Sequence, residues 1–308
     1  MRLLFCLIAQ LLMVQPVFAQ GDFAPPPSKD DPLGIQRLKP LPAGVILIPG
    51  AVPSASDTRT SLPETGTIRK NVYDNAYFGI TWAFPEQWGE EFKGPPPSDT
   101  GQYVLANLVG NRASILVTAQ DLFFALTPPS KIALPSYYKM EAEPSDIQIA
   151  KAAFSRYSYM SPVAGLHWVV FATEIRCHLV QFVLTSQDTK LLEQVVENLK
   201  QIKLSAGADV PRCVADYARP ENIVYKSDPV LADTKFNPIP VRIIIGKNGK
   251  VRHVHVISAF ASQAQTVTDA MMQWRFKPSE AEIETGILFG SSITRRRAPT
   301  TSASSISE

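Results

Sequence analysis

The stretch from Pro238 to Ile293 constrains the fold more than any other part of the chain. It begins with a run of β-branched apolar residues, Val241 to Ile245, and the turn sequence Asn248-Gly249 follows. An Asn-Gly pair between two apolar runs is the strongest short-range signal for a β-hairpin. We therefore predict that Val251 to Ile257 returns as the second strand of an antiparallel pair.

A helix and a third strand complete this stretch. Apolar residues recur at spacings of three and four, as on one face of a helix: Val267, Ala270, Met271 and Trp274. Proline lacks the backbone N–H that a helix needs, so Pro278 marks the end of the helical pattern. A last apolar run, Gly286 to Phe289, then predicts a strand.

Residues 71–204 contain a second set of strand patterns. Apolar residues, many of them aromatic or β-branched, predict strands near 73–84, 103–108, 113–120, 166–173 and 177–185. An amphipathic helix that Asp188 or Ser186 caps is expected next. Its apolar stripe consists of Leu191, Leu192, Val195, Val196, Leu199 and Ile202. A further helical pattern, interrupted by Pro135, lies between Ser130 and Glu143.

The N-terminus has the pattern of a secretory signal peptide. Arg2 supplies a positive charge, residues 3–14 are apolar apart from one glutamine, and Ala19 occupies the expected cleavage position. The alternative is an uncleaved membrane anchor, but the apolar run is shorter than the roughly 20 residues that span a bilayer. We therefore expect a periplasmic or secreted protein without a stable membrane span after cleavage.

Residues 20–70 are typical of a proline-rich tether. Proline alternates there with serine, threonine, aspartate and glycine, and such a segment buries too little apolar surface to offset its ordering entropy. We expect it to be mostly disordered. One apolar island, residues 44–49, is the exception, and it is expected to dock as an edge strand or to bind a partner.

Three cysteines constrain the covalent structure. Cys6 lies in the signal peptide, so the mature chain keeps Cys177 and Cys213. An even number of cysteines in an oxidising compartment permits one disulfide. The alternative is two buried thiols, with Cys177 in the core of a strand.

Motifs for catalysis are absent from the sequence, which has no phosphate-binding glycine loop, Gly-x-Ser-x-Gly or His-Glu-x-x-His. A net charge of +2 gives no argument for nucleic acid. His253 and His255 alternate on one face of a strand, and such a pair ligates a metal only if further ligands converge. We expect these two to be exposed strand residues, with no metal, no cofactor, no catalytic residue and no enzymatic activity. A metal-dependent enzyme that uses His253 and His255 is the alternative.

Two resemblances add to this interpretation. The sequences Tyr77 to Thr81 and Phe84 to Trp88, with the stretch from Phe182 to Leu199, are similar to the PsbP-like family of α+β domains over residues 71–204. That resemblance implies a binding or assembly module without a shared catalytic set.

Residues 221–293 resemble the C-terminal domain of the TonB family. Val241 to Ile245 and Gly249 to Val251 match its hairpin, and Ala270 to Pro278 matches its helix with the Trp-Arg-Phe-x-Pro signature. The family's Tyr-Pro element ahead of the first strand is not obvious here, and residues 259–262 replace the glycine that precedes the helix.

The TonB resemblance implies a protein partner. Three strands and a helix leave one strand edge with unpaired N–H and C=O groups, which an incoming extended segment can complete. In the family this segment belongs to an outer-membrane receptor. We place the edge at the last strand, with an arginine cluster beside it. The expected partner-binding residues are Ile287, Leu288, Phe289, Ile293, Arg295, Arg296 and Arg297.

The patterns together predict an α+β protein of two small domains, each an antiparallel sheet with packed helices, joined by short linkers. The expected parts are a signal peptide (1–19), the tether (20–70), a PsbP-like domain (71–204), a linker (205–220), a TonB-like domain (221–293) and a disordered tail (294–308). We expect a non-enzymatic interaction protein of the cell envelope. An energy-transducing TonB-type protein of outer-membrane transport is the alternative if the N-terminus stays anchored.

Overall fold

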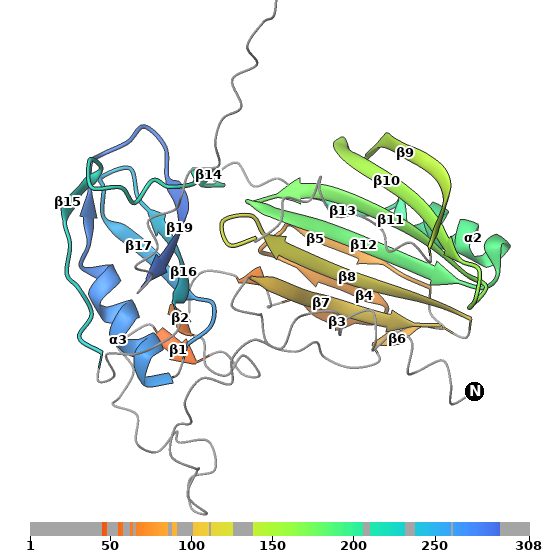
Figure 1. Ribbon diagram of the computed structural model, residues 1–308, viewed down its shortest axis with the longest axis horizontal. Helices are drawn as coiled ribbons and strands as arrows, with labels where there is room; N and C mark the ends of the chain where they lie inside the picture. The colour runs from red at the N-terminus through yellow and green to blue at the C-terminus, as the bar shows by residue number, and fades with distance from the viewer. Residues whose placement is uncertain are drawn as a thin grey trace, which may run out of the picture. The chain divides into compact units, whose positions relative to one another are not determined.

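The computed structural model describes residues 45–47, 55–57, 62–63, 66–85, 88–90, 101–110, 112–125, 138–205, 210–231, 238–259 and 261–289. The chain divides into two compact units, and every described residue lies in the second, Lys39–Glu308. The described residues form nineteen strands and two helices (Figure 1). The predicted α+β class is therefore wrong, because this part of the chain is a β-rich fold of several, mostly antiparallel sheets.

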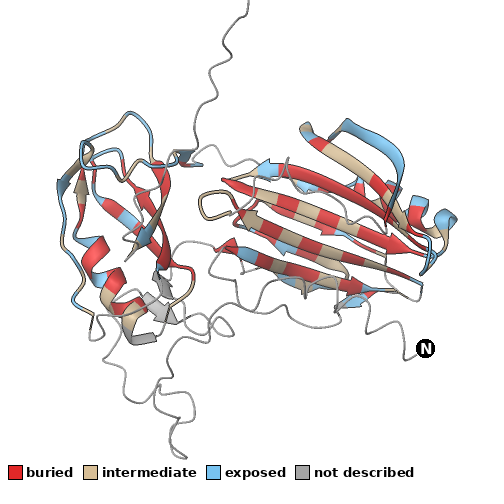
Figure 2. Ribbon diagram, in the orientation of Figure 1, coloured by how far each residue is buried: buried red, intermediate tan, exposed pale blue. Residues whose placement is uncertain are grey.

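The largest sheet has seven antiparallel strands in the order β6-β7-β8-β12-β11-β10-β9. In chain order they are β6 (Gly89–Glu90), β7 (Gln102–Val109), β8 (Ala113–Asp121), β9 (Lys139–Ile149), β10 (Ala152–Ser161), β11 (Leu166–Ile175) and β12 (His178–Ser186). Buried and half-buried residues alternate along β8, as expected for a strand whose two faces meet different surroundings (Figure 2).

The β9–β10 hairpin accounts for much of the error in the predicted fold class. The helical pattern assigned to Ser130–Glu143 extends into β9, which pairs with β10 along its length. β9 is the edge strand of the sheet and is exposed at most positions, so it lacks the apolar alternation that identifies a strand in sequence. An edge strand also tolerates Pro144, because its outer N–H groups need no partner strand.

A four-stranded sheet and helix α2 share one hydrophobic core with the seven-stranded sheet. The strands are β3 (Thr67–Arg69), β4 (Val72–Asn75), β5 (Ile80–Ala83) and β13 (Lys203–Leu204), in the order β13-β5-β4-β3. Helix α2 (Thr189–Leu199) begins where Asp188 accepts hydrogen bonds from the N–H groups of Lys190 and Leu191, so the predicted helix and cap are confirmed. Its buried residues are Leu192, Val195, Val196 and Leu199.

The six-stranded sheet contains β16, β17 and β19, which come from the stretch that begins at Pro238. Its order is β1-β2-β17-β16-β19-β14, and β14 alone runs parallel to its neighbour. The strands are β1 (Val45–Leu47), β2 (Ala55–Asp57), β14 (Arg212–Cys213), β16 (Ile239–Ile245), β17 (Val251–Val256) and β19 (Ile283–Phe289). β1 lies at one edge of the sheet, so the apolar island at 44–49 contains a strand within the proposed tether.

Helix α3 (Ala261–Met272) follows the β16–β17 hairpin, in the predicted order. Gly249 in the hairpin turn has φ 76°, and a Cβ atom there would lie 2.0 Å from the carbonyl oxygen of Phe276, so a side chain does not fit. The short strands β15 (Ile223–Tyr225) and β18 (Arg275–Phe276) form a separate pair. Among the described residues, no helix has the length and hydrophobicity needed to cross a membrane.

Candidate functional site

A groove lies beside the second half of β19, because β14 covers only the first half. β14 pairs with β19 at Ile283 and Glu284, and the chain then turns at Asp216, which has a φ of 59°. Within the described parts of the chain, no strand pairs with the outer edge of β19 from Gly286 to Leu288.

The backbone groups of Gly286 and Leu288 point to this open edge. The N–H of Val214 donates to the carbonyl oxygen of Glu284 at 3.0 Å, so the backbone of Glu284 faces the β14 side. Backbone N–H and C=O groups of alternate residues point to the same side of a strand, which places those of Gly286 and Leu288 on that side as well. An extended segment that enters here can therefore form ladder hydrogen bonds.

Apolar side chains line the groove, whose volume is about 510 Å³. The indole Nε1 of Trp274 donates to the carbonyl oxygen of Ser227 at 2.8 Å, which fixes the ring in place. The Lys226 ammonium nitrogen lies 5.4 Å from the centre of the same ring. The lining residues are Ala218, Pro220, Ile223, Lys226, Trp274, Ile287, Leu288 and Phe289.

The residues predicted to bind a partner fall into two groups. Ile287, Leu288 and Phe289 all line the groove. The others, Ile293 and the arginines at 295, 296 and 297, lie outside the described residues. The last strand was expected to be an edge strand. Among the described residues, β19 is one only in its second half, because β14 pairs with it at Ile283 and Glu284.

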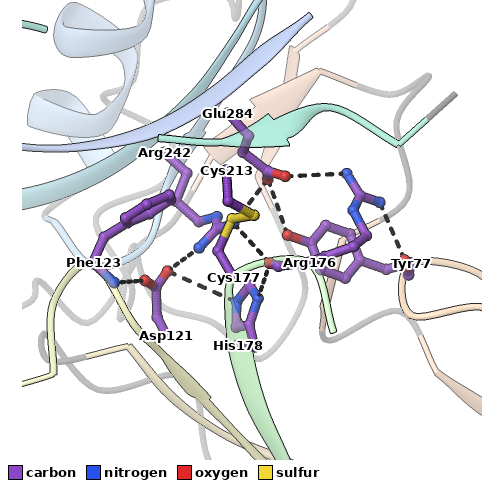
Figure 3. Close-up of a disulfide and its surroundings, with 9 residues drawn as sticks. All are labelled: Tyr77, Asp121, Phe123, Arg176, Cys177, His178, Cys213, Arg242 and Glu284. Atoms are coloured by element: carbon purple, nitrogen blue, oxygen red, sulfur yellow. Dashed lines mark hydrogen bonds and ion pairs between the residues drawn. A yellow bond between two sulfur atoms is a disulfide. The ribbon is translucent and has the colours of Figure 1, made fainter. Parts of the chain in front are cut away.

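A cluster of charged residues lies buried on the other face of the six-stranded sheet from its hydrophobic core (Figure 3). Arg242 of β16 is 2% exposed, and its Nη1 atom lies 2.5 Å from Oδ2 of Asp121, at the end of β8. Its Nη2 atom lies 2.9 Å from Oε1 of Glu284 in β19. Because Asp121 belongs to the seven-stranded sheet, these ion pairs connect the two large sheets.

Two further residues extend this charge cluster: Arg176, in the turn between β11 and β12, and Tyr77, between β4 and β5. The Nη2 atom of Arg176 lies 3.6 Å from Oε2 of Glu284, and its guanidinium carbon lies 3.9 Å from the centre of the Tyr77 ring. The Tyr77 hydroxyl donates to Oε1 of Glu284 at 3.1 Å. Glu284 therefore contacts two guanidinium groups and a phenol, while all of these groups are largely withdrawn from water.

Burial and the neighbouring positive charges shift the pKa values of the Glu284 and Asp121 carboxyl groups in opposite directions. Burial favours the neutral form of Glu284, but Arg242 and Arg176, with the hydrogen bonds from Arg242 and Tyr77, outweigh it and lower the pKa of this carboxyl. For Asp121 burial prevails over Arg242 and raises the pKa. Burial would lower the pKa of Arg242, yet Asp121, Tyr77 and Glu284 raise it well above its usual range, so this guanidinium stays charged.

His178 is a neutral member of the charge cluster. Its Nδ1 lies 2.7 Å from the carbonyl oxygen of Arg176, which can only accept, so Nδ1 carries the proton. Burial, followed by the positive charge of Arg242, holds the pKa of His178 well below its usual range. Its Nε2 lies 3.7 Å from Oδ2 of Asp121, too far for a hydrogen bond.

A disulfide joins Cys177 to Cys213 beside the charge cluster, with 5.8 Å between the Cα atoms (Figure 3). Cys177 lies in the two-residue turn between β11 and β12, where Arg176 and Cys177 have φ values of 49° and 59°. Positive φ at both positions is what a type I′ hairpin requires, so Cys177 lies in a turn and not in the core of a strand. Cys213 belongs to β14, and the bond therefore ties β14 to the seven-stranded sheet.

The structure buries the two histidines that were predicted to be exposed. His253 is 5% and His255 2% exposed, and His255 pairs with Arg242 across the hairpin, on the same face of the sheet. The prediction was wrong because this face packs against other parts of the chain. Among the described residues, no three His, Cys, Asp or Glu side chains lie close enough together to hold a metal.

The sequence contained one signal for the charge cluster. Arg242 interrupts the apolar run Val241 to Ile245, and a charged residue inside a buried strand requires a partner of opposite charge. The partners were missed because Asp121 lies 121 residues before Arg242 in the sequence and Glu284 lies 42 residues after it.

Comparison with solved structures finds the solution structure of cyanobacterial PsbP (CyanoP) from Synechocystis sp. PCC 6803. The TM-score is 0.31 and the identity 13%, over 48% of this chain and 99% of that chain. No family model and no curated protein matches the chain. Part of the chain thus weakly resembles a PsbP structure, while the resemblance to the TonB family stays a prediction without support from these comparisons.

Proposed function

We propose that this chain is a non-enzymatic protein of the cell envelope that binds an extended segment of a partner protein by strand addition to β19. The observation that carries the proposal is the apolar groove beside Gly286 to Leu288, where the outer edge of β19 is open in the described part of the chain. Backbone pairing supplies affinity in this binding mode, and side-chain pockets supply selectivity.

The absence of catalysis in this proposal rests on burial. Four charged or titratable members of the charge cluster, Arg242, Asp121, Glu284 and His178, are each at most 2% exposed. Groups so far from water contact no substrate in this conformation. Their ion pairs join two sheets, which is a structural role.

The compartment and the partner are inferred from separate features. The signal-like N-terminus and the Cys177–Cys213 disulfide both favour the periplasm or the exterior, where disulfides persist. The TonB-like sequence of residues 221–293 favours an outer-membrane protein as the partner.

Photo-crosslinking from the groove tests the proposal. A photoreactive amino acid at Leu288 is compared with one at Met140, since both positions are 45% exposed. Both also lie on strands that have an edge without a partner strand among the described residues. We expect Leu288, and not Met140, to capture one defined envelope protein in cells. Equal capture from both positions, or none from Leu288, would contradict strand addition at β19.

A backbone variant separates strand addition from simple apolar contact. Leu288→Pro removes an N–H that faces the open edge and has no role in pairing with β16, so the fold should persist. Leu288→Val keeps the N–H and serves as the matched control. With the photoreactive group at the neighbouring groove residue Ile223, we expect capture to be lost in the proline variant and kept in the valine variant.

A further inference from the structure

Few interactions hold β14 on the edge of β19. The N–H of Arg212 donates to the carbonyl oxygen of Glu282 at 2.8 Å, and that of Val214 to the carbonyl oxygen of Glu284 at 3.0 Å. Both residues of β14, Arg212 and Cys213, are exposed. Val214, just after β14, is partly buried against the core of the six-stranded sheet. Two backbone hydrogen bonds and this one apolar contact contribute little net stability against the entropy of ordering the segment.

The disulfide supplies a covalent link that holds β14 in place. It ties Cys213 to Cys177, which is buried in the two-residue turn between β11 and β12 of the seven-stranded sheet. The chain beyond β14 has its own anchors, since Tyr217 packs against Phe276 with 6.0 Å between ring centres, and its N–H donates to Oγ1 of Thr285 at 3.3 Å. Between β14 and these anchors lies Asp216, whose φ of 59° marks a turn.

We propose that the Cys177–Cys213 disulfide controls how much of the β19 edge is open to a partner. This inference rests on the proposed function. In the oxidised protein, β14 occupies the edge at Ile283 and Glu284, and only the second half of β19 accepts a strand. In the reduced protein, Arg212 to Val214 swing away about Asp216, and the open edge extends along the whole of β19.

The chemical step is thiol–disulfide exchange with a dithiol reductant. Cys213 is the exposed partner, so a thiolate of the dithiol attacks its Sγ, a mixed disulfide forms and Cys177 leaves as a thiolate. The second thiol of the reductant then attacks the mixed disulfide, and Cys213 leaves as a thiolate. The dithiol becomes a disulfide, the protein gains two electrons, and the two cysteines take up the two protons that the dithiol gives up.

Release of β14 leaves the two large sheets together. Arg242 still contacts Asp121 and Glu284, and Arg176 still contacts Glu284, whatever the state of the cysteines. Phe123 also lies against Gly286, where an added Cβ atom would come within 2.6 Å of the Phe123 Cβ. The change is therefore local to β14.

Amide hydrogen exchange of the full chain tests the release without any partner. Dithiothreitol, with reduction verified by thiol titration, is expected to speed exchange of the Arg212 and Val214 amides by about tenfold or more. The amide of Ile243, in the centre of the six-stranded sheet, should stay unchanged. The double variant Cys177→Ser/Cys213→Ser should exchange quickly at Arg212 and Val214 with or without the reductant. Unchanged exchange at these two amides, or faster exchange at Ile243 as well, would overturn the proposal.

Partner capture then tests the consequence for binding. Photo-crosslinking from Leu288 in envelope extract, without reductant, compares the wild type with Cys177→Ser/Cys213→Ser, and we expect several-fold more capture by the variant. Equal capture would overturn control by the disulfide while leaving the proposed function intact. No capture by either protein would refute the proposed function, and with it any control of binding, while the exchange result at β14 would stand by itself.

Discussion

Replacing Arg242 with alanine tests whether the charge cluster stabilises the contact between the two large sheets. The guanidinium group is 2% exposed and lies 2.5 Å from Asp121 and 2.9 Å from Glu284. Removing one partner of a buried ion pair costs about 3–5 kcal/mol, because the remaining charge is left without compensation. Two carboxylates lose their shared partner here, which argues for a cost in that range.

The carboxylates keep some stabilising contacts, and these limit the loss. Asp121 still accepts a hydrogen bond from the N–H of Phe123 at 2.7 Å. Glu284 keeps the hydroxyl of Tyr77 at 3.1 Å and the guanidinium of Arg176 at 3.6 Å. We therefore expect Arg242→Ala to lower the free energy of unfolding by about 3–4 kcal/mol, the lower half of the range for a broken buried pair.

Urea unfolding at pH 7, followed by tryptophan fluorescence, measures this loss. The matched control is Arg252→Ala, which removes an exposed arginine of β17 that pairs with Glu282 at the surface and should cost less than about 1 kcal/mol. The double variant Arg242→Met/Asp121→Asn should recover part of the stability, since it removes the Arg242–Asp121 pair and leaves Glu284 beside Arg176 and the Tyr77 hydroxyl. If Arg242→Ala costs no more than Arg252→Ala, the reasoning about the buried cluster is wrong.

Three further predictions concern single residues. Lowering the pH from 7 to 5 should destabilise the wild type by up to about 1.4 kcal/mol per pH unit. The reason is that His178 has a lowered pKa in the folded chain, so the unfolded chain binds a proton at this residue and the folded chain does not. Urea titrations of the wild type and His178→Asn measure this contribution, and identical pH slopes would contradict it. Gly286→Ala should cost about 1–3 kcal/mol, because its methyl group would lie 2.6 Å from the Phe123 Cβ, and an unchanged midpoint of thermal unfolding would refute this close approach. Asp188→Ala should cost about 1 kcal/mol by removing the N-cap of α2, while Asp188→Asn, which still accepts the hydrogen bonds, should cost far less. Thermal unfolding followed by circular dichroism measures both variants.

Local sequence signals predicted the elements whose formation depends on near neighbours. The Asn248-Gly249 turn places a hairpin between two apolar runs, and the structure has β16 and β17 there. The apolar stripe behind Asp188 predicts α2 in the same way, because a cap and a helical period lie within a few residues of each other. In both cases the information is contained in a short window of sequence.

Longer-range pairing could not be predicted from the same signals. β9 is a strand because β10 pairs with it, although its exposed, polar residues have no alternation of their own. His255 was expected at the surface because it alternates with His253 on one face of a strand and no further ligand stands near the pair in the sequence. What buries it is a surface formed by residues far away in sequence, with Asp121 opposite Arg242 on that same face.

The buried polar face also decides which side of β19 remains for a partner. One edge of the strand pairs with β16, and Ile283 on one face belongs to the core of the six-stranded sheet. On the other face, Glu284 binds Arg242, and Gly286 lies against Phe123. The outer edge beside Leu288 is therefore the side at which the described residues leave β19 open. Packing of a partner against a face of the sheet would displace this core or break the ion pairs, whereas strand addition at the edge disturbs neither, and for that reason we favour it as the mode of binding.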